Sequence, residues 1–258
     1  MRIAIAGIFL LSGVACMAQA PQMQQQHSYA PAQDGGVREV LESIVIPPIP
    51  HSPFTATLAT EWTRYTPDGA SITLVNERRI ARDGRGRVYQ ERWYLVPKDG
   101  KVQSTMNWIQ IADPKALIRY NCSVEKHRCD LLPYDPGDAL AAVSAHRTSG
   151  QMPEGRGEIA IEELGERNMA GVDTVGIRET DTINPGVMGN DRPITAVSES
   201  WHSKELAINV LSIVTGPTIG KQTFTITELT PSEPDPQLFE LPAGYKVNDQ
   251  RKDPAVSR

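Results

Sequence analysis

The chain has 258 residues, of which 40% are hydrophobic, and it carries 26 basic and 31 acidic residues. This length fits one large domain or two small ones, and this hydrophobic content is that of an ordinary globular protein, which excludes wholesale disorder. The net charge of −5 excludes a nucleic-acid-binding protein that relies on a broad basic surface.

The first residues have the pattern of a secretory signal peptide. A basic residue precedes an uncharged, mostly apolar run from Ile3 to Ala15, which is too short for a comfortable membrane span. We expect cleavage after Ala18, which removes residues 1–18 and exports the chain to the periplasm. Two alternatives stay open, namely cleavage after Ala20 and lipidation of Cys16 as in an outer-membrane lipoprotein. Nothing downstream is apolar for long enough to span a bilayer.

The predicted mature chain begins with a polar leader and ends in a polar tail. Residues 19–36 are rich in Gln, Pro, Ala and Gly, a composition typical of disorder. Apolar residues then recur at helical spacing, which predicts a short amphipathic helix over 37–46 that ends before Pro47. We expect a single β domain over 37–247 and a flexible tail over 248–258.

From Phe54 the hydrophobic period changes to two, which is typical of half-buried strands. Turn signals rich in Gly, Pro and Asp separate the first four segments and predict an antiparallel meander. An alanine-rich segment predicts a second short helix over 138–146. The predicted strands cover residues 54–63, 71–82, 87–96, 102–112, 116–122, 128–132, 159–164, 172–182, 194–201, 207–215 and 222–229.

These elements predict a mainly β fold built on one large, curved antiparallel sheet. Twist accumulates across so many strands, so the sheet has to curl into an unclosed β-barrel. The helices predicted over 37–46 and 138–146 are the candidates to cover its concave face. Such an arrangement favours an apolar cavity.

Two cysteines remain after the signal peptide, Cys122 and Cys129. Because an oxidising compartment favours their pairing, we predict a disulfide across a short loop. Free thiols are one alternative. A metal site that also uses His127 is another, although structural zinc sites have four ligands and more regular spacing.

The C-terminal third contains three stretches that resemble the periplasmic lipoprotein-carrier-like (LolA/LolB-like) superfamily. Residues 199–206 resemble the family's strand and turn of the form W-x-D-x-x-T-x-L. The strand pair 207–215 and 222–229 follows, and residues 235–245 are similar to the family's D-x-x-L-F-x-x-P-x-G ending. The resemblance implies an unclosed β-barrel whose apolar hollow holds an acyl chain or a peptide. Ser203 stands where the family commonly has an acidic residue, and no binding residue of the family transfers to this chain.

The four tryptophans are the candidate residues for an apolar ligand. Each lies in a strand-like context, and two interpretations fit them: packing within the sheet, or lining of a ligand site. They are Trp62, Trp93, Trp108 and Trp201.

Arg85 and Arg87 lie at a glycine-rich hairpin tip between two predicted strands. They are the candidate contact for an anionic partner, with a solvated turn as the alternative. Further arginines flank the tip and add to a local basic patch, unless they pair with Glu77 and Glu91. These are Arg78, Arg79, Arg82 and Arg92.

The sequence contains no Gly-x-Ser-x-Gly, no phosphate-binding glycine loop and no His-Glu-x-x-His. We therefore expect no catalytic residue, no metal and no cofactor. The leading hypothesis is an exported, non-enzymatic binding protein of the cell envelope that accommodates an apolar group such as a lipid or lipoprotein acyl chain. The alternative is an envelope sensor or protein-interaction module without a small ligand, whose partner is another envelope protein.

Overall fold

The computed structural model describes residues 43–144 and 147–251, and its strands form one mainly antiparallel 14-stranded sheet that does not close. This confirms the predicted fold class. The strands are β1 (Phe54–Tyr65), β2 (Ser71–Arg82), β3 (Val88–Trp93), β4 (Val96–Pro97), β5 (Met106–Asp113), β6 (Ile118–Ser123), β7 (Arg128–Pro133), β8 (Gly150–Gln151), β9 (Gly157–Met169), β10 (Val172–Ile183), β11 (Ile194–Ser203), β12 (Ile208–Gly216), β13 (Gly220–Thr230) and β14 (Lys246–Asp249).

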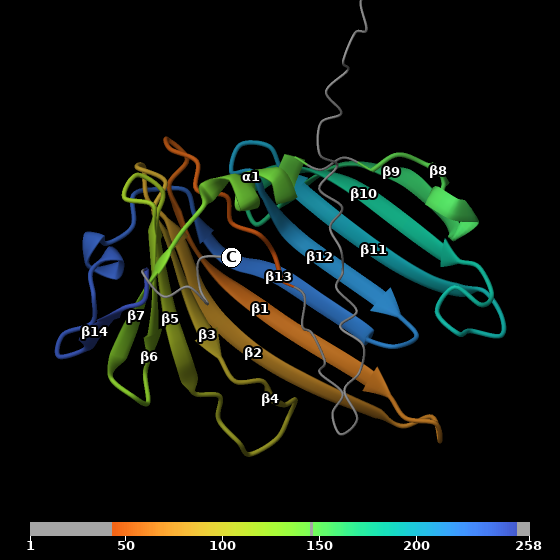
Figure 1. Ribbon diagram of the computed structural model, residues 1–258, viewed down its shortest axis with the longest axis horizontal. Helices are drawn as coiled ribbons and strands as arrows, with labels where there is room; N and C mark the ends of the chain where they lie inside the picture. The colour runs from red at the N-terminus through yellow and green to blue at the C-terminus, as the bar shows by residue number, and fades with distance from the viewer. Residues whose placement is uncertain (1–42, 145–146, 252–258) are drawn as a thin grey trace, which may run out of the picture. The chain divides into compact units, whose positions relative to one another are not determined.

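Two meanders, β1–β7 and β8–β13, make up most of this sheet. Each runs through antiparallel neighbours, and they join where β1 pairs with β13, with Leu58 opposite Ile226. Figure 1 shows these two long strands side by side at the centre of the sheet. The short β4 lies off this path and pairs only with β2.

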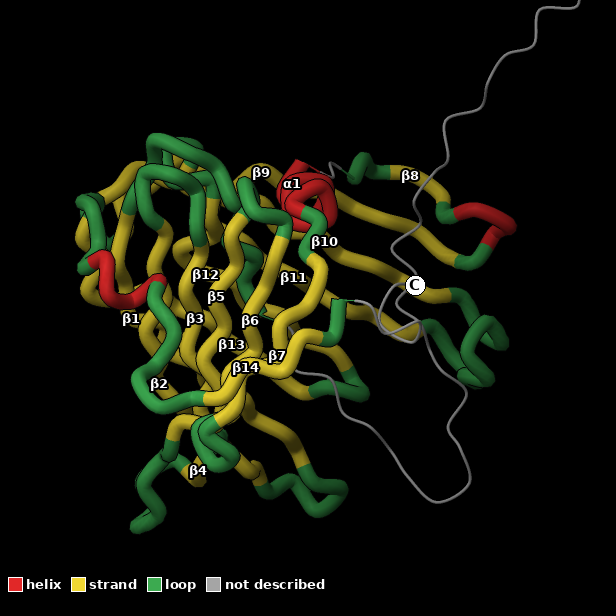
Figure 2. The backbone as a smooth tube through the Cα atoms, turned by 60° about the vertical axis from the view of Figure 1, so that its left-hand side comes forward, coloured by secondary structure: helices red, strands yellow, loops and turns green. Residues whose placement is uncertain are grey.

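One end of the sheet is formed by a strand that the sequence does not predict. β14 pairs in parallel with β7, with Asn248 opposite Asp130, and Figure 2 shows it in front of β7. Asn248 and Asp249 therefore belong to the sheet, although the sequence places them in the flexible tail. Parallel pairing at an edge depends on the return of a distant segment, which local alternation cannot reveal.

The described helices are short. The α-helix α1 (Pro136–Ser144) begins before the predicted 138–146, and it runs from the β7 side toward β9 and β10 (Figures 1 and 2). Two 3₁₀ turns, η1 (Pro153–Gly155) and η2 (Pro236–Phe239), complete the list. Residues 43–46 are not helical, so this end of the helix predicted over 37–46 is wrong. Its remainder, the signal peptide and the leader lie outside the described residues.

The main core lies on one side of the sheet, which we call the Phe54 face. Phe54, Leu58 and Ile80 are fully buried there. Apolar residues of segment 43–50 pack onto them, as do the buried side chains of β12 and β13. Burial of this apolar area is the main stabilising contribution of the fold.

The opposite side, which we call the Tyr89 face, carries a smaller core. Ala81, Tyr89 and Ile111 come from three adjacent strands, and Phe239 of η2 packs against them. Arg87 stacks over the Phe239 ring at 4.6 Å from its centroid. The C-terminal segment is thus fixed to this face before β14 begins.

Cys122 and Cys129 form a disulfide between β6 and β7. The two residues are directly opposite each other in the ladder and fully buried. The ring of His127, the third member of the alternative metal site, lies against Tyr245. Because the bridged loop is short, we expect the bond to contribute about 2–3 kcal/mol to stability.

Candidate functional site

The four candidate tryptophans do not share one site. Trp62 is on β1, Trp93 on β3, Trp108 on β5 and Trp201 on β11. Trp62 is 7% exposed and Trp201 is 3% exposed. The indole N–H of Trp62 donates to the Ile219 carbonyl at 2.7 Å, so this side chain is bonded to the turn between β12 and β13.

Trp201 fills a space left by a glycine. Its ring packs over Gly176 of β10 beside Leu164, and Arg167 stacks on it at 4.2 Å. Its indole N–H donates to Glu199 at 2.8 Å. An aromatic ring that covers a strand glycine restores the packing that the missing side chain would give, and Trp201 packs in this way.

Trp93 lines an open groove of about 850 Å³, which we call the Trp93 groove. Ligand pockets span about 300–1,000 Å³, and the volume of this groove lies within that range. The lining comes from β1, β2, β13, the end of β3 and the segment after β3 that contains β4. Its residues are Ala59, Thr60, Glu61, Val75, Asn76, Glu77, Trp93, Val96, Lys98, Asp99, Ser104, Lys221, Thr223 and Thr225.

The groove lies where β2 and β3 separate. Their ladder runs only from Ile80 to Arg82, and beyond it side chains replace the main-chain bonds. The Asn76 amide donates to the Trp93 carbonyl at 2.7 Å, and the Arg78 guanidinium donates to the Glu91 carbonyl at 3.2 Å. The wider spacing between these strands makes room for the groove.

Glu91 fixes the orientation of Trp93. Its carboxylate accepts from the Trp93 indole at 2.8 Å, from the Tyr89 hydroxyl at 3.0 Å and from the Arg79 main-chain N–H at 3.1 Å. Burial and the neighbouring Glu91 charge raise the pKa of Tyr89, which stays protonated as a donor. With its N–H satisfied, the Trp93 indole presents an apolar surface.

The outer wall of the groove is the segment from Tyr94 to Thr105, which we call the β4 loop. It is held by the two-residue strand β4 and by an exposed ion pair between Lys98 and Glu61 at 2.7 Å. Tyr94 is 53% exposed and Val102 is 62% exposed. Exposed ion pairs contribute little, so main-chain bonds are the firmer anchors of this wall, among them the bond from the Lys98 N–H to the Thr73 carbonyl at 2.9 Å.

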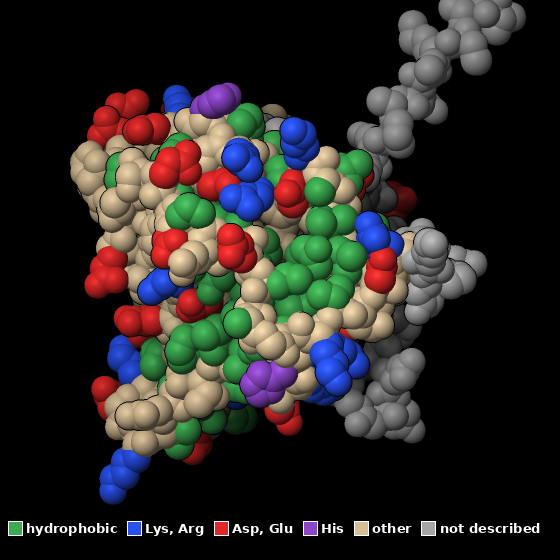
Figure 3. Space-filling view, turned by 90° about the vertical axis from the view of Figure 1, so that its left-hand side faces the viewer, with side chains coloured by type: hydrophobic (Ala, Val, Ile, Leu, Met, Phe, Trp, Pro, Cys, Tyr) green, Lys and Arg blue, Asp and Glu red, His purple; other side chains and the backbone are tan. Residues whose placement is uncertain are grey.

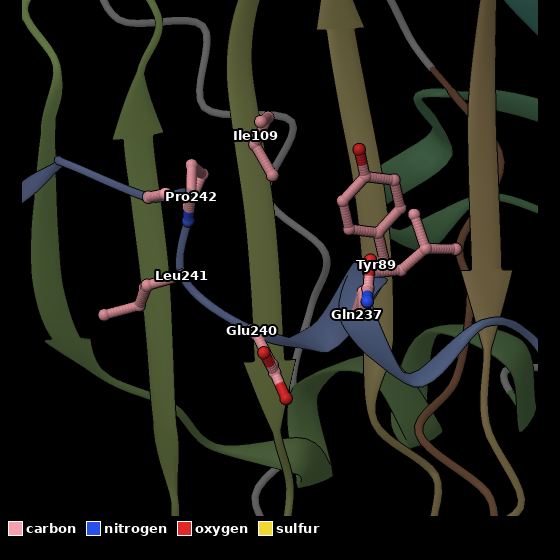
Figure 4. Close-up of a pocket in the computed structure, with 8 residues that line it drawn as sticks. Tyr89, Ile109, Gln237, Glu240, Leu241 and Pro242 are labelled. Carbon is pink, nitrogen blue, oxygen red and sulfur yellow. The ribbon is translucent and has the colours of Figure 1, made fainter.

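A second cavity of about 360 Å³ lies between the sheet and the C-terminal segment. Figure 4 shows that segment crossing in front of β3 and β5, with Tyr89 and Ile109 behind Gln237, Glu240, Leu241 and Pro242. Figure 3 views the side of the molecule on which β14 lies, where hydrophobic side chains gather between charged ones. The chain itself covers this part of the sheet, and the cavity has less than half the volume of the Trp93 groove.

The two arginines of the hairpin tip differ in their surroundings. Arg87 pairs with Asp83 at 2.7 Å and stacks on Phe239, whereas Arg85 is exposed. The main chain of the tip is held by Glu233, whose carboxylate accepts from the Gly84 N–H at 3.0 Å. Only Arg85 is thus presented to solvent.

The flanking arginines do not form the surface patch that the sequence suggests. Arg82 is fully buried and Arg78 is 5% exposed, both on the Phe54 face. Burial lowers the pKa of Arg82 to about 10 and, together with the nearby Arg92, that of Arg78 to about 9. The sequence does contain an indication of their burial, because Arg78 and Arg82 lie at every second position with the apolar Ile80.

Among residues 43–144 and 147–251, no group of three or more His, Cys, Asp and Glu side chains is placed to hold a metal ion. The described part of the chain has no helix long and apolar enough to cross a membrane.

No family model matches this sequence, and no curated protein matches it. Several solved structures are similar in fold. An uncharacterized conserved protein from Thermus thermophilus is 10% identical over 77% of this chain and 90% of that chain, with a TM-score of 0.40. The MucA/MucB complex of Pseudomonas aeruginosa contains a chain that is 14% identical over 79% of this chain and 60% of that one, with a TM-score of 0.39.

A LolA superfamily protein from Nitrosomonas europaea is 9% identical over 74% of this chain and 91% of that chain, with a TM-score of 0.30. The similarity of these structures to this chain is remote, with TM-scores between 0.30 and 0.40. These likenesses concern the fold alone.

Proposed function

We propose that this chain is an exported, non-enzymatic binding protein of the cell envelope, and that the Trp93 groove receives an apolar group such as an acyl chain. The observation that supports this best is the open groove of about 850 Å³ beside an indole whose N–H is already bonded. Its floor is made of small side chains, Ala59, Thr223 and Thr225, which leave space above the sheet.

The composition of the groove favours an amphipathic ligand over a purely apolar one. Trp93, Val75 and Val96 supply apolar surface, and each CH₂ group that they bury contributes about 0.8 kcal/mol. Lys98 and Lys221 add positive charge to the lining, and Glu61, Glu77 and Asp99 add negative charge. A polar head can therefore remain among charged groups while the chain lies against the indole.

Native mass spectrometry of the mature protein, before and after removal of lipid and with an added fatty acid as probe, tests this proposal. Thr225→Phe fills the floor of the groove and should abolish the mass excess. The matched control is Thr227→Phe, two residues along the same strand face and outside the lining. We expect the control to bind as the wild type does. Absence of probe binding in the wild type contradicts the proposal, and equal binding by both variants contradicts the assignment to this groove.

A protein-interaction role is the second candidate, and β14 is the observation that favours it. All four of its residues are exposed, and it is the last strand at its end of the described sheet. Edge strands of this kind accept an added strand from a partner. Val247→Pro, which removes an edge N–H, should then reduce capture of an envelope protein without altering probe binding in the groove.

A further inference from the structure

The Phe54 face also carries three arginines that do not line the Trp93 groove, namely Arg78 on β2, Arg92 on β3 and Arg119 on β6, which we call the arginine row. In the ladders, Arg92 is opposite Trp108, Gln90 is opposite Gln110, and Arg119 is opposite Ala112. Residues at paired positions share a face. Ile80 and Arg82 of the Phe54 face are opposite Gln90 and Val88, so alternate residues of β3, β5 and β6 continue that face. Arg78, Arg92 and Arg119 therefore lie on the same side of the sheet.

Arg78 is held by neutral acceptors. Its guanidinium donates to the Ser43 hydroxyl at 2.7 Å, the Gln90 side chain at 3.3 Å and the Glu91 carbonyl at 3.2 Å. The carboxylate of Glu91 is engaged on the Tyr89 face instead. Arg78 is thus a buried cation without a carboxylate bonded to it in the described structure.

Arg92 and Arg119 are half-buried and equally uncompensated. The Nε of Arg92 donates to Gln110 at 2.7 Å, and Gln110 donates in turn to Asn121 at 3.2 Å. The Nε of Arg119 is buried and has no hydrogen-bond partner within the described ranges. Buried donors are nearly always satisfied in native proteins, so the Arg119 Nε–H is a donor that a ligand oxygen can satisfy.

The carboxylates near this row are already occupied or lie at its margin. Asp130, opposite Asn121, pairs with Arg128 at 3.2 Å and accepts from Asn248 at 2.9 Å. Asp135 and Asp138 lie near Tyr134 at the start of α1. Positive charge therefore dominates the centre of the row.

Two pairs of these guanidinium groups also repel each other, Arg78 with Arg92 and Arg92 with Arg119. After burial, the charge of Arg92 is the next cause that lowers the pKa of Arg78, and the charge of Arg119 likewise lowers that of Arg92. Arginine remains protonated at neutral pH, so the repulsion persists until a counter-charge arrives.

We propose that Arg78, Arg92 and Arg119 form a binding site for a phosphoryl group, with Gln110 and Asn121 as neutral hydrogen-bonding partners. A phosphoryl group carries up to two negative charges and enough oxygens to accept from several planar guanidinium forks at once. It would supply the acceptor that the Arg119 Nε lacks and would screen the repulsion along the row. Inorganic phosphate, a phosphorylated small molecule and a phospholipid headgroup share this chemistry.

The test is an NMR titration of the full-length mature protein with inorganic phosphate, observing the arginine Nε–Hε resonances. The Nε–Hε signals of Arg92 and Arg119 should shift with saturation. The Arg82 signal should not, because its Nε and both of its terminal nitrogens already donate to main-chain carbonyls. A parallel sedimentation assay with vesicles of neutral phospholipid, with and without anionic phospholipid, distinguishes a headgroup from a soluble phosphate.

Two substitutions and a charge-matched control complete the experiment. Arg92→Gln and Arg119→Gln should each weaken phosphate binding at least tenfold, whereas Arg85→Gln, which removes an exposed charge at the hairpin tip, should change it less than twofold. Far-UV circular dichroism and unfolding midpoints establish that each variant folds. Arg92→Lys keeps the positive charge but removes the planar guanidinium with its several N–H donors.

Each result bears on the proposal. Phosphate shifts confined to Arg78, Arg92 and Arg119, with the expected losses in the variants, support a site for soluble phosphates. Sedimentation that depends on anionic lipid and on Arg92, without phosphate shifts, supports a headgroup site. Equal effects of all three Gln substitutions indicate diffuse electrostatic attraction and overturn the site. Absence of both phosphate and vesicle binding overturns it as well, and neither outcome affects fatty-acid binding in the Trp93 groove.

Discussion

The Arg82 guanidinium donates to the Leu206 carbonyl at 2.7 Å across 124 residues of sequence. The same side chain donates to the Pro47 carbonyl at 2.8 Å and to the Ser52 carbonyl at 2.9 Å. A single buried cation therefore ties β2 to the segment that precedes β1 and to the turn between β11 and β12. The same guanidinium also stacks on the Phe54 ring, 5.1 Å from its centroid.

We expect Arg82→Met to destabilise the protein by about 3–5 kcal/mol. The substitution keeps much of the side-chain volume but leaves three carbonyls without donors, two of them in buried bonds. Each charge-assisted bond contributes about 1.5–3 kcal/mol, and removal of a buried charge, which is costly to desolvate, offsets part of their summed loss. Urea unfolding followed by far-UV circular dichroism measures the change. The control is Arg79→Met, because Arg79 lies three positions earlier on β2 and is exposed. A loss below about 1 kcal/mol for Arg82→Met would show that water replaces the guanidinium.

Strands with one buried face are predictable from the sequence, and strands defined by distant pairing are not. The predicted bounds of β2 match the observed ones because turn signals flank the strand and the side chains from Asn76 to Ile80 alternate between buried and exposed. The parallel pairing of β14 with β7 and the joining of β1 to β13 connect segments far apart in sequence. Neither leaves a local pattern.

The candidate site shows a similar limit. Sequence identifies the tryptophans as large side chains in strands but cannot say which ring lies over a glycine and which lies beside a gap. Trp201 covers Gly176 because the two are opposite each other in the β10–β11 ladder, and Trp93 lines a groove because β2 and β3 separate there. Both facts depend on the register of the strand pairs. Bulges at Gly176 and at Trp201 shift that register further.

The contact between Gly176 and Trp201 predicts a steric penalty. A Cβ atom at Gly176 would lie 2.8 Å from two carbons of the indole ring and 2.9 Å from the Leu164 Cβ. We expect Gly176→Ala to lower the free energy of unfolding by about 1–3 kcal/mol, as overpacking does. Gly216→Ala is the control, because the nearest atom to its added Cβ lies at 3.5 Å. Addition of Trp201→Leu to Gly176→Ala should restore part of the loss, and its failure to do so would point to another cause.

Reduction of the disulfide between Cys122 and Cys129 should lower stability by about 2–3 kcal/mol, because the bridge restricts the accessible conformations of only a small loop. Urea unfolding with and without dithiothreitol measures this difference. The double variant Cys122→Ala and Cys129→Ala should match the reduced wild type and should not respond to dithiothreitol. A response of the double variant would mean that the reductant acts elsewhere.

Glu199 gives a prediction for the pH dependence of stability. The hydrogen bond from the Trp201 indole, followed by the bond and charge of Arg178, holds the pKa of Glu199 below its ordinary value. A carboxyl whose pKa is lowered by folding stabilises the protein above its unfolded pKa of about 4.3, and this contribution is lost as the pH falls through the folded value. Glu199→Gln should therefore destabilise the protein by about 1 kcal/mol at pH 7 and by much less at pH 3, measured by urea unfolding.

The control for Glu199 is Glu162→Gln. Glu162 also pairs with Arg178, at 2.7 Å, but its side chain is 60% exposed, so water screens the pair and removal of the charge should change stability by only a few tenths of a kcal/mol at either pH. A deficit of Glu199→Gln that stays constant from pH 7 to pH 3 would mean that the Glu199 charge contributes nothing and that the loss comes from side-chain packing beside Trp201.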